Sequence, residues 1–327
     1  MKSSHQISST NSSPESLSWP SGASSIETAA FPRGLGEIWR ACGAFEWVTF
    51  AYLAGISALL LVFHRSVAHT ALYLVAHAWL SIGIICLALA AAHSKNPVLR
   101  FARSWYPLPL YIGLFEELGG LVHMIFPGWF DRWLLQFDYG FAGVHPCVWL
   151  AHFSSPAMNE FMQFAYMTYF LYLVILPAIL YVHKEPLAFW TVMVSTAVAH
   201  YSVYAVALFF PIEGPYYSLP PLETNSHAGG YFTATIDFIE GIARVHGAAF
   251  PSAHVAGSMV ALLAAYRYRR WLFWICLPFF ASMCVATVYG RYHYVADVLA
   301  GIAVGAIGFG AGSWLMERKG APAEIAE

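Results

Sequence analysis

The sequence predicts an all-α, polytopic bundle of about eight transmembrane helices. Apolar residues make up 59% of its 327 residues, whereas about 45–50% is usual for a soluble globular protein. Charged residues make up only 10%, against a usual share of about 25%. A helix needs about 20 apolar residues to cross a bilayer core about 30 Å thick. Eight runs come near that length, at residues 45–63, 70–92, 105–126, 160–182, 187–210, 251–266, 271–289 and 295–316.

Two of these runs fit the pattern of a span less well than the other six. The third contains Pro107, Pro109 and the pair Glu116 and Glu117, and charged residues are costly at this depth. The sixth run is short for a bilayer core. An odd number of spans therefore stays open on hydropathy alone.

The distribution of Lys and Arg favours eight spans with both termini in the cytoplasm, because cytoplasmic loops are enriched in these residues. In this orientation the cytoplasmic segments carry twelve of the 16 Lys and Arg residues. We therefore expect a cytoplasmic tail over residues 1–44, a membrane-embedded domain over 45–317 and a second tail over 318–327. The first tail is polar and Ser-rich, which predicts disorder. The outer segments hold the remaining arginines, Arg65, Arg132, Arg244 and Arg291.

The composition excludes several classes of protein. A net charge of −2 leaves no basic surface for nucleic acid. The five cysteines have neither the spacing of a zinc finger nor that of a disulfide scaffold. No cofactor is expected, and the sequence identifies no protein partner.

Two long segments fall on the outer side in this topology. Residues 128–159 mix aromatic and polar side chains, as in a helix that lies in the membrane interface. Residues 211–250 carry Gly-Pro, Pro-Pro and Gly-Gly turn signals. A loop of this length between spans is more often functional than idle.

The densest polar cluster lies where the last three spans meet the outer side. The sixth span opens with Pro251, Ser252 and His254. Proline suits the first turn of a helix, whose free amides and dipole attract anions. His293 and Asp297 are four residues apart, so on a helix the carboxylate can hold one imidazole nitrogen while the other faces outward. This pattern favours an activated nucleophile or base, and a pair that merely solvates the interface is the alternative.

The phrases Pro-Ser-Ala-His at 251–254 and His-Tyr-Val-Ala-Asp at 293–297, with a glycine at 301, resemble two motifs of the type 2 phosphatidic acid phosphatase superfamily. The phrases Gly-Ala-Ala-Phe at 247–250 and Tyr-His-Tyr-Val-Ala-Asp at 292–297 resemble those of the branch that includes inositolphosphoryl ceramide synthases. The resemblance implies a six-helix core and phosphoryl transfer through a phosphohistidine. It implies that His293 is the nucleophile and Asp297 its orienting partner. It further implies that His254 protonates the leaving oxygen and that Ser252 donates a hydrogen bond to phosphate.

The chain departs from this family's pattern at two phosphate-binding cations. Tyr216 stands where related sequences often have Arg, and Thr287 stands where an Arg precedes the nucleophile by six residues. The outer arginines near the motif phrases are Arg291, Arg244 and Arg132. We expect them to bind phosphate in place of the two missing cations. For Arg291, an anchor at the membrane interface is an equal alternative. Tyr216 remains a candidate for substrate binding.

Four further ionisable side chains lie within apolar runs. A charge near the middle of the third run is costly unless it is paired or protonated. Either one of Glu116 and Glu117 lines the substrate cavity, with Glu117 as the candidate, or both are hydrogen-bonded within the bundle. His77 and His200 are single on apolar helices, so we expect core histidines with satisfied hydrogen bonds.

We predict an integral membrane enzyme that hydrolyses a lipid phosphate at the extracytoplasmic face, without a metal. Transfer of a phospho-headgroup to an alcohol such as inositol or ceramide is the close alternative. A third alternative is a transporter in which His293 and Asp297 relay protons. The clustering of the polar groups at one side of the membrane does not favour it. A metal site made of His254, His293 and Asp297 would lack a recognised ligand spacing.

Overall fold

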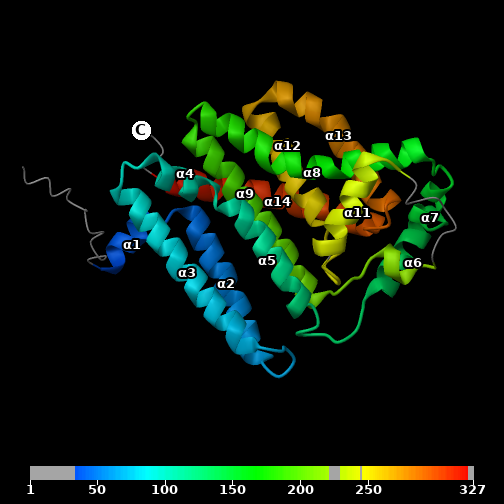
Figure 1. Ribbon diagram of the computed structural model, residues 1–327, viewed down its shortest axis with the longest axis horizontal. Coiled ribbons are helices and arrows are strands. Elements are labelled where there is room, and N and C mark those ends of the chain that lie inside the picture. Colours follow the sequence, from blue (N-terminus) through cyan, green and yellow to red (C-terminus); the bar gives the residue numbers. More distant parts are fainter. Residues whose placement is uncertain (1–33, 221–228, 244, 323–327) are drawn as a thin grey trace, which may run out of the picture.

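The computed structural model describes residues 34–220, 229–243 and 245–322, and these residues form a helical bundle without a β-strand (Figure 1). An isolated bridge between Ile212 and Ala248 is the one pairing of extended backbone among them. The helices are α1 Leu35–Ala41, α2 Ala44–Val62, α3 Thr70–His93, α4 Pro97–Trp105, α5 Pro107–Leu121, α6 Asp131–Ala142, α7 Pro146–Ala151, α8 Pro156–Val182, α9 Pro186–Phe209, α10 Pro215–Ser218, α11 Tyr231–Ala243, α12 Ala253–Tyr268, α13 Arg270–Tyr289 and α14 Val295–Lys319.

All eight predicted runs fold as helices, but six rather than eight are long and apolar enough to cross a membrane. These six are α2, α3, α8, α9, α13 and α14, and they make the chain a multi-pass membrane protein. The third and sixth runs form α5 and α12, which have 15 and 16 residues. At about 1.5 Å per residue, each is shorter than the bilayer core. The third run is shortened because Pro107 starts a new helix directly after α4.

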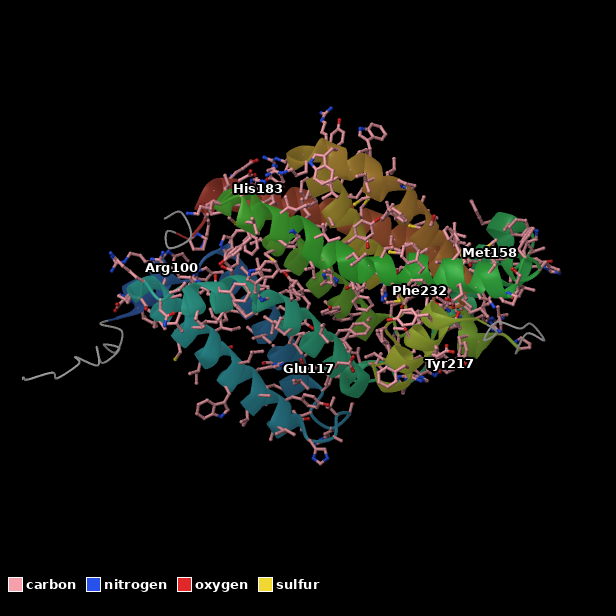
Figure 2. The ribbon with its side chains drawn as sticks, turned by 45° about the horizontal axis from the view of Figure 1, so that its top comes forward. Arg100, Glu117, Met158, His183, Tyr217 and Phe232 are labelled. Atoms are coloured by element: carbon pink, nitrogen blue, oxygen red, sulfur yellow. The ribbon has the colours of Figure 1, made fainter. Side chains whose placement is uncertain are left out.

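The described chain begins and ends at the same end of the bundle. Nζ of Lys319, in the last turn of α14, lies 4.5 Å from the ring centroid of Trp39 in α1 and 5.6 Å from that of Trp47 in α2. Figure 1 shows α1 and α4 at this terminal end, and α6 and α7 at the opposite end, termed the site end. In Figure 2, Arg100 lies at the terminal end and Tyr217 at the site end. The helices of the described chain, with the shorter α5 and α12 included, therefore pass between the two ends an even number of times.

The predicted tail over residues 1–44 is wrong in its last part, because residues 35–41 form α1. The buried Arg103 of α4 holds this helix in place. Its Nη2 donates to the carbonyl oxygen of Ala41 at 2.5 Å, and its Nε lies 3.4 Å from Oε1 of the buried Glu46. Glu37 also pairs with His93 of α3 at 3.0 Å. Residues 1–33 lie outside the described residues.

The most buried long helix is α9, which packs against α2, α5, α8, α12 and α14. Its His200 is fully buried, and Nε2 of the ring lies 3.0 Å from the hydroxyl of Tyr169. Nδ1 lies 3.0 Å from the carbonyl oxygen of Thr196. Both ring nitrogens are bonded, so the prediction of a satisfied core histidine is confirmed for His200.

Glycines let α14 approach its neighbours closely. Gly301 and Gly305 face α12, and Gly308 and Gly312 face α9; they recur every three or four residues and so share one face of the helix. A Cβ atom at Gly305 would lie 2.5 Å from the carbonyl oxygen of Ala256. This close packing fixes the beginning of α14 against α12, and the predicted catalytic residues lie at these two helix starts.

Gly305→Ala is expected to lower the melting temperature of the protein in detergent, because overpacking a tight contact costs about 1–3 kcal/mol. Gly310→Ala is the matched control, since a Cβ atom there meets nothing within 4 Å. At that exposed position alanine favours the helix by up to about 1 kcal/mol. Thermal unfolding followed by circular dichroism measures both variants. Equal melting temperatures would contradict the close packing of α14.

The two long segments between the spans both carry helices at the site end. Residues 128–159, predicted as interfacial helix, contain α6 and α7. Residues 211–250, predicted as a loop, also contain α11, whose first amides are capped from another helix. The carboxylate of Glu160 in α8 accepts hydrogen bonds from the backbone N–H groups of Gly230, Phe232 and Thr233 at 2.7–3.0 Å. No local capping signal in the sequence marks this helix start.

Candidate active site

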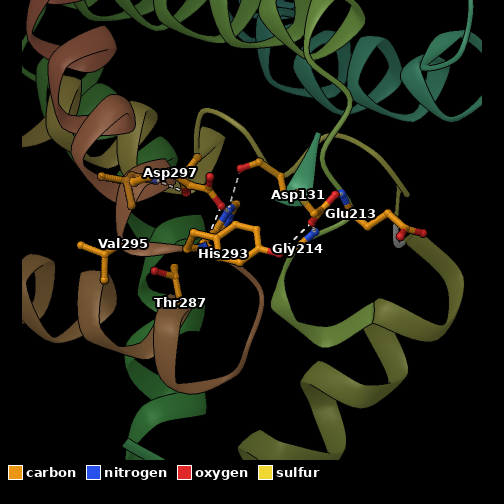
Figure 3. A network of polar contacts seen from close by, with 12 residues as sticks. Asp131, Glu213, Gly214, Thr287, His293, Val295 and Asp297 are labelled. Carbon is orange, nitrogen blue, oxygen red and sulfur yellow. Dashed lines mark hydrogen bonds and ion pairs between the residues drawn. The ribbon is translucent and has the colours of Figure 1, made fainter. Parts of the chain in front are cut away.

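His293 lies in the short segment between α13 and α14 and is only 6% exposed (Figure 3). Its Nδ1 lies 2.8 Å from the carbonyl oxygen of Ala249 and 3.4 Å from Oδ2 of Asp297. A carbonyl oxygen only accepts hydrogen bonds, so Nδ1 carries the proton and Nε2 of the neutral ring keeps its lone pair. No hydrogen bond joins Nε2 to the described residues. The ring therefore offers a nucleophilic nitrogen, and His293 lines a cavity.

Asp297 is fully buried in the first turn of α14 and connects the two motif phrases. Its Oδ2 accepts a hydrogen bond from the backbone N–H of Tyr294 at 2.8 Å. Its backbone carbonyl oxygen accepts one from the N–H of Ser252 at 3.1 Å. Oδ1 is buried without a hydrogen-bond partner in the described part of the chain. The structure thus brings Asp297 to His293, as predicted, although the carbonyl of Ala249 is the nearer partner of Nδ1.

His254 lies in the first turn of α12, beside the predicted nucleophile. The ring centroids of His254 and His293 are 6.0 Å apart, and both residues line the cavity. Nε2 of His254 lies 3.0 Å from the hydroxyl of Tyr166 in α8. Ser252 is fully buried and caps α12, since its Oγ accepts a hydrogen bond from the N–H of Val255 at 3.3 Å. It is not among the described lining residues, so its phosphate role stays a prediction.

Asp131 at the start of α6 connects α6 to the segments that precede α10 and α14 by hydrogen bonds. The sequence did not predict this residue as part of the site. Its carboxylate accepts hydrogen bonds from the hydroxyl of Tyr294 at 2.8 Å and from the N–H groups of Glu213 and Gly214 at 3.0 and 2.9 Å (Figure 3). Burial raises the pKa of the Glu213 carboxyl, and the nearby Asp131 carboxylate raises it further. Asp131 therefore fixes the residue next to His293 against the segment that follows α9.

Asp138, two turns further along α6, caps the helix that carries Asp297. Its carboxylate accepts hydrogen bonds from the N–H groups of Val295 and Ala296 at 3.0 and 3.3 Å. Burial raises the pKa of Asp138, and these two hydrogen bonds oppose that rise. Acidic residues seven apart share a helix face, which is the signal that the sequence offered for this pair.

A cavity of about 440 Å³ opens beside the two histidines. Its walls come from α5, α8, α9, α10, α11 and the start of α12, and from the segments before α10, α12 and α14. One part is apolar and aromatic, with Ile112, Phe115, Phe170 and Leu173. The cavity can therefore hold an apolar chain beside polar chemistry. Its described tyrosines are Tyr111, Tyr166, Tyr169, Tyr204, Tyr216, Tyr217 and Tyr292.

Arg291 and Tyr216, two predicted substrate-binding residues, line the cavity together. Nη2 of Arg291 donates to the carbonyl oxygens of Pro215, Leu219 and Pro220 at 2.9, 2.9 and 3.0 Å. The N–H of Tyr216 donates to the carbonyl oxygen of Arg291 at 3.0 Å. Nε of Arg291 is buried without a partner among the described residues. The loop therefore holds this guanidinium in a fixed position at the cavity wall.

The structure describes one of the two other arginines that were predicted as phosphate-binding cations. Arg132 is exposed on α6 and is not a lining residue. Arg244 lies outside the described residues. Thr287 is fully buried, and its Oγ1 donates to the carbonyl oxygen of Cys284 at 2.8 Å. No second cation replaces the two missing arginines along the described lining.

The choice of Glu117 as a cavity residue is wrong, because Glu116 lines the cavity instead. Oε1 of Glu117 lies 2.7 Å from Nε2 of His77, and Nδ1 of His77 lies 2.8 Å from Oγ of Ser57. The hydrogen bond to His77 therefore places the Glu117 side chain between α2, α3 and α5. It also confirms His77 as a core histidine with both nitrogens bonded.

Asp297→Asn is expected to slow turnover by about 10²-fold, less than the roughly 10⁴-fold loss seen when a triad aspartate loses its charge. The loss is smaller because the carbonyl of Ala249 still holds the proton on Nδ1 of His293. Steady-state kinetics of the purified variant measure this effect. A loss equal to that of removing His293 would show that the carboxylate, and not the carbonyl, determines the tautomer.

The fold and the site define a class, that of multi-pass helical membrane proteins with a paired-histidine site at one end of the bundle. The chain belongs to the PAP2 superfamily, whose sequence profile matches residues 132–311, from α6 to α14. This superfamily comprises phosphatase and phosphotransferase enzymes. The match does not distinguish the inositolphosphoryl ceramide synthase branch, which stays a prediction. Neither the curated proteins nor the solved structures compared with the chain give a match.

Proposed function

We propose that the protein is a lipid phosphatase that hydrolyses a lipid phosphate through a phosphohistidine on His293. The observation that carries the proposal is the hydrogen bond from Nδ1 to the carbonyl of Ala249, which leaves a lone pair on Nε2 beside the cavity. The apolar cavity wall of α5 and α8 suits an acyl chain, and membership of the PAP2 superfamily supports this type of chemistry.

In the first half of the proposed reaction, Nε2 of His293 attacks phosphorus and the bond from phosphorus to the lipid oxygen breaks. His254 delivers a proton to that oxygen, so the lipid alcohol leaves. The carboxylate of Asp297, 3.4 Å from Nδ1, balances the charge that develops on the ring. In the second half, water attacks phosphorus, the nitrogen–phosphorus bond breaks, and His254 takes the proton of the water.

The metal-site alternative gains no support from the geometry of these side chains. Among the described residues, no group of three His, Cys, Asp or Glu side chains is arranged to hold a metal ion. Transfer to an alcohol is the second candidate, because Glu213, Tyr216 and Tyr217 give the cavity a polar wall that suits a hydroxylated acceptor.

The test is to incubate the purified protein with lipid phosphates while the concentration of inositol is raised. Free phosphate and lipid products are measured side by side, with and without EDTA. We expect phosphate release that stays constant with inositol and survives EDTA. Release that falls as a phosphodiester product appears would favour the transferase. Inactivation by EDTA that divalent ions reverse would overturn the metal-free mechanism.

We further propose that the site end faces the extracytoplasmic side and that both termini are cytoplasmic. The test places single cysteines at two exposed arginines in a cysteine-free background. Arg132→Cys lies on α6 at the site end, and Arg267→Cys lies at the terminal end of α12. An impermeant thiol reagent should label position 132 in intact cells and leave position 267 unlabelled. The reverse pattern would invert the topology.

A further inference from the structure

Helix α6 at the site end presents three faces of different chemistry. One face is buried against the site and carries Asp131, Leu134 and Asp138. A second face is aromatic, and it carries Trp133, Phe137 and Phe141, which are 68%, 47% and 70% exposed. These three recur every four residues and so share one side of the helix. The third face is also exposed and carries the polar groups of Arg132, Gln136 and Tyr139.

The hydrogen bonds of Asp138 fix the depth of α6 relative to the bilayer. Its carboxylate accepts from the N–H groups of Val295 and Ala296, the first two residues of α14. Helix α14 is one of the six helices long and apolar enough to cross a membrane, and the start of such a helix lies where the bilayer core meets the headgroups. Helix α6 therefore lies at the headgroup level. With 12 residues it is too short to cross the bilayer itself.

The aromatic face of α6 suits the membrane interface better than water. Aromatic side chains are enriched at this level of a bilayer, and a helix that lies there buries its apolar face about 5–10 Å into the boundary of headgroups and acyl chains. A cluster of exposed aromatic rings is rare on surfaces that face water alone. The adjacent helix α7 also exposes an aromatic pair, Trp149 and Phe153, whose ring centroids are 5.1 Å apart. The faces of α6 thus match lipid, water and protein in turn.

We propose that the aromatic face of α6 binds the headgroup region of the bilayer, and that Asp131 and Asp138 thereby hold His293 at a fixed depth in the membrane. The partner of this surface is a lipid surface and not another protein. The contact of α6 with lipid does not depend on the reaction, whereas its effect on turnover rests on the proposed function.

The two carboxylates connect the lipid-facing helix to the residues directly after His293. Asp131 accepts a hydrogen bond from the hydroxyl of Tyr294 at 2.8 Å, and Asp138 accepts one from the N–H of Val295 at 3.0 Å. The phosphate of a membrane lipid lies at the headgroup level, so an attacking nitrogen has to be held at that depth. A misplacement of about 1 Å costs up to about 10²-fold in rate. The depth of α6 therefore matters for the reaction.

A fluorescent probe at two adjacent positions tests the contact with lipid. Phe137→Cys and Gln136→Cys are each labelled with an environment-sensitive dye in a cysteine-free background, and the protein is placed in phosphatidylcholine vesicles. Lipids with a doxyl group near the head of the acyl chain should quench the dye at 137 at least about threefold more strongly than the dye at 136. Iodide in the water should show the reverse order. Equal quenching by lipid at both positions, or a dye at 137 that neither quencher reaches because protein covers it, would overturn the proposal.

Hydrogen exchange tests the connection to α14 without turnover, because the amides of Val295 and Ala296 are those bonded to Asp138. In lipid nanodiscs, the double variant Trp133→Gln and Phe137→Gln should speed the exchange of these amides by at least about tenfold. Tyr139→Gln, an exposed aromatic on the other face of α6, is the matched control and should leave it unchanged. Trp133→Phe with Phe137→Leu keeps the apolar surface and should keep the slow exchange. Unchanged exchange in the glutamine double variant would contradict the connection.

A soluble substrate tests the effect on the reaction. The glutamine double variant in nanodiscs should hydrolyse a nitrophenyl phosphate ester with kcat lowered by about tenfold, while Tyr139→Gln keeps the kcat of the unmodified protein. Since this ester reaches the site from water, the loss cannot come from weaker binding of a lipid. Equal kcat values for the two variants would overturn the claim that α6 holds His293. An unmodified protein that hydrolyses neither lipid nor ester would refute the proposed function, and the quenching and exchange results would still decide this inference.

Discussion

His293→Ala is expected to abolish turnover, with a loss on the order of 10⁶-fold, as when an essential catalytic histidine is removed elsewhere. The reason is that, in the proposed mechanism, Nε2 of this ring forms the bond to phosphorus, and no other described side chain offers an equivalent nitrogen in that position. His254 is the nearest ring, but its Nε2 is already bonded to Tyr166. The measurement is the rate of lipid alcohol release by the purified variant.

The same prediction has a direct chemical readout. Rapid quenching of the unmodified protein with labelled substrate, without acid, should trap phosphate in a linkage that is labile in acid and stable in base. The label should be absent in His293→Ala. His152→Ala is the matched control, since His152 is exposed and, among the described residues, its ring makes one hydrogen bond, from Nδ1 to the carbonyl oxygen of Trp149. Turnover or labelling retained without His293 would rule out the proposed nucleophile.

Hydropathy predicts the long helices to within a few residues, because each must present an apolar surface to lipid or to its neighbours. It cannot predict α11, whose first amides are capped by Glu160 from α8. It also misses α1, which the side chain of Arg103 holds at its last turn. Both helices depend on contacts between segments far apart in the chain, and these contacts leave no local pattern.

The site residues also divide into those that a local sequence pattern predicts and those that depend on contacts between distant segments. The motif spacing places His254, His293 and Asp297 together, because two helix starts at one end of a bundle bring their first turns close. The carbonyl of Ala249, which fixes the tautomer, is a backbone group and has no signature in the sequence. Adjacent residues on a helix point about 100° apart, so packing alone determines that Glu116 rather than Glu117 faces the cavity.

His254→Gln is expected to lower turnover of lipid substrates by about 10²–10⁴-fold, the usual contribution of general acid catalysis. A lipid alkoxide is a poor leaving group unless it is protonated as the bond to phosphorus breaks. In our proposal that proton comes from His254, whose ring lies beside His293 with centroids 6.0 Å apart. Glutamine keeps a polar side chain of similar reach but supplies no acid.

Substrates with different leaving groups distinguish a proton donor from a structural residue. A nitrophenyl phosphate ester releases a stable phenolate without protonation, so His254→Gln should impair its hydrolysis far less than that of the lipid. Tyr166→Phe, which removes the hydroxyl 3.0 Å from Nε2 of His254, should cause a smaller loss with the lipid, because the acid remains but is less well oriented. Equal losses of His254→Gln with both substrates would mean that the ring shapes the site and does not protonate the departing oxygen.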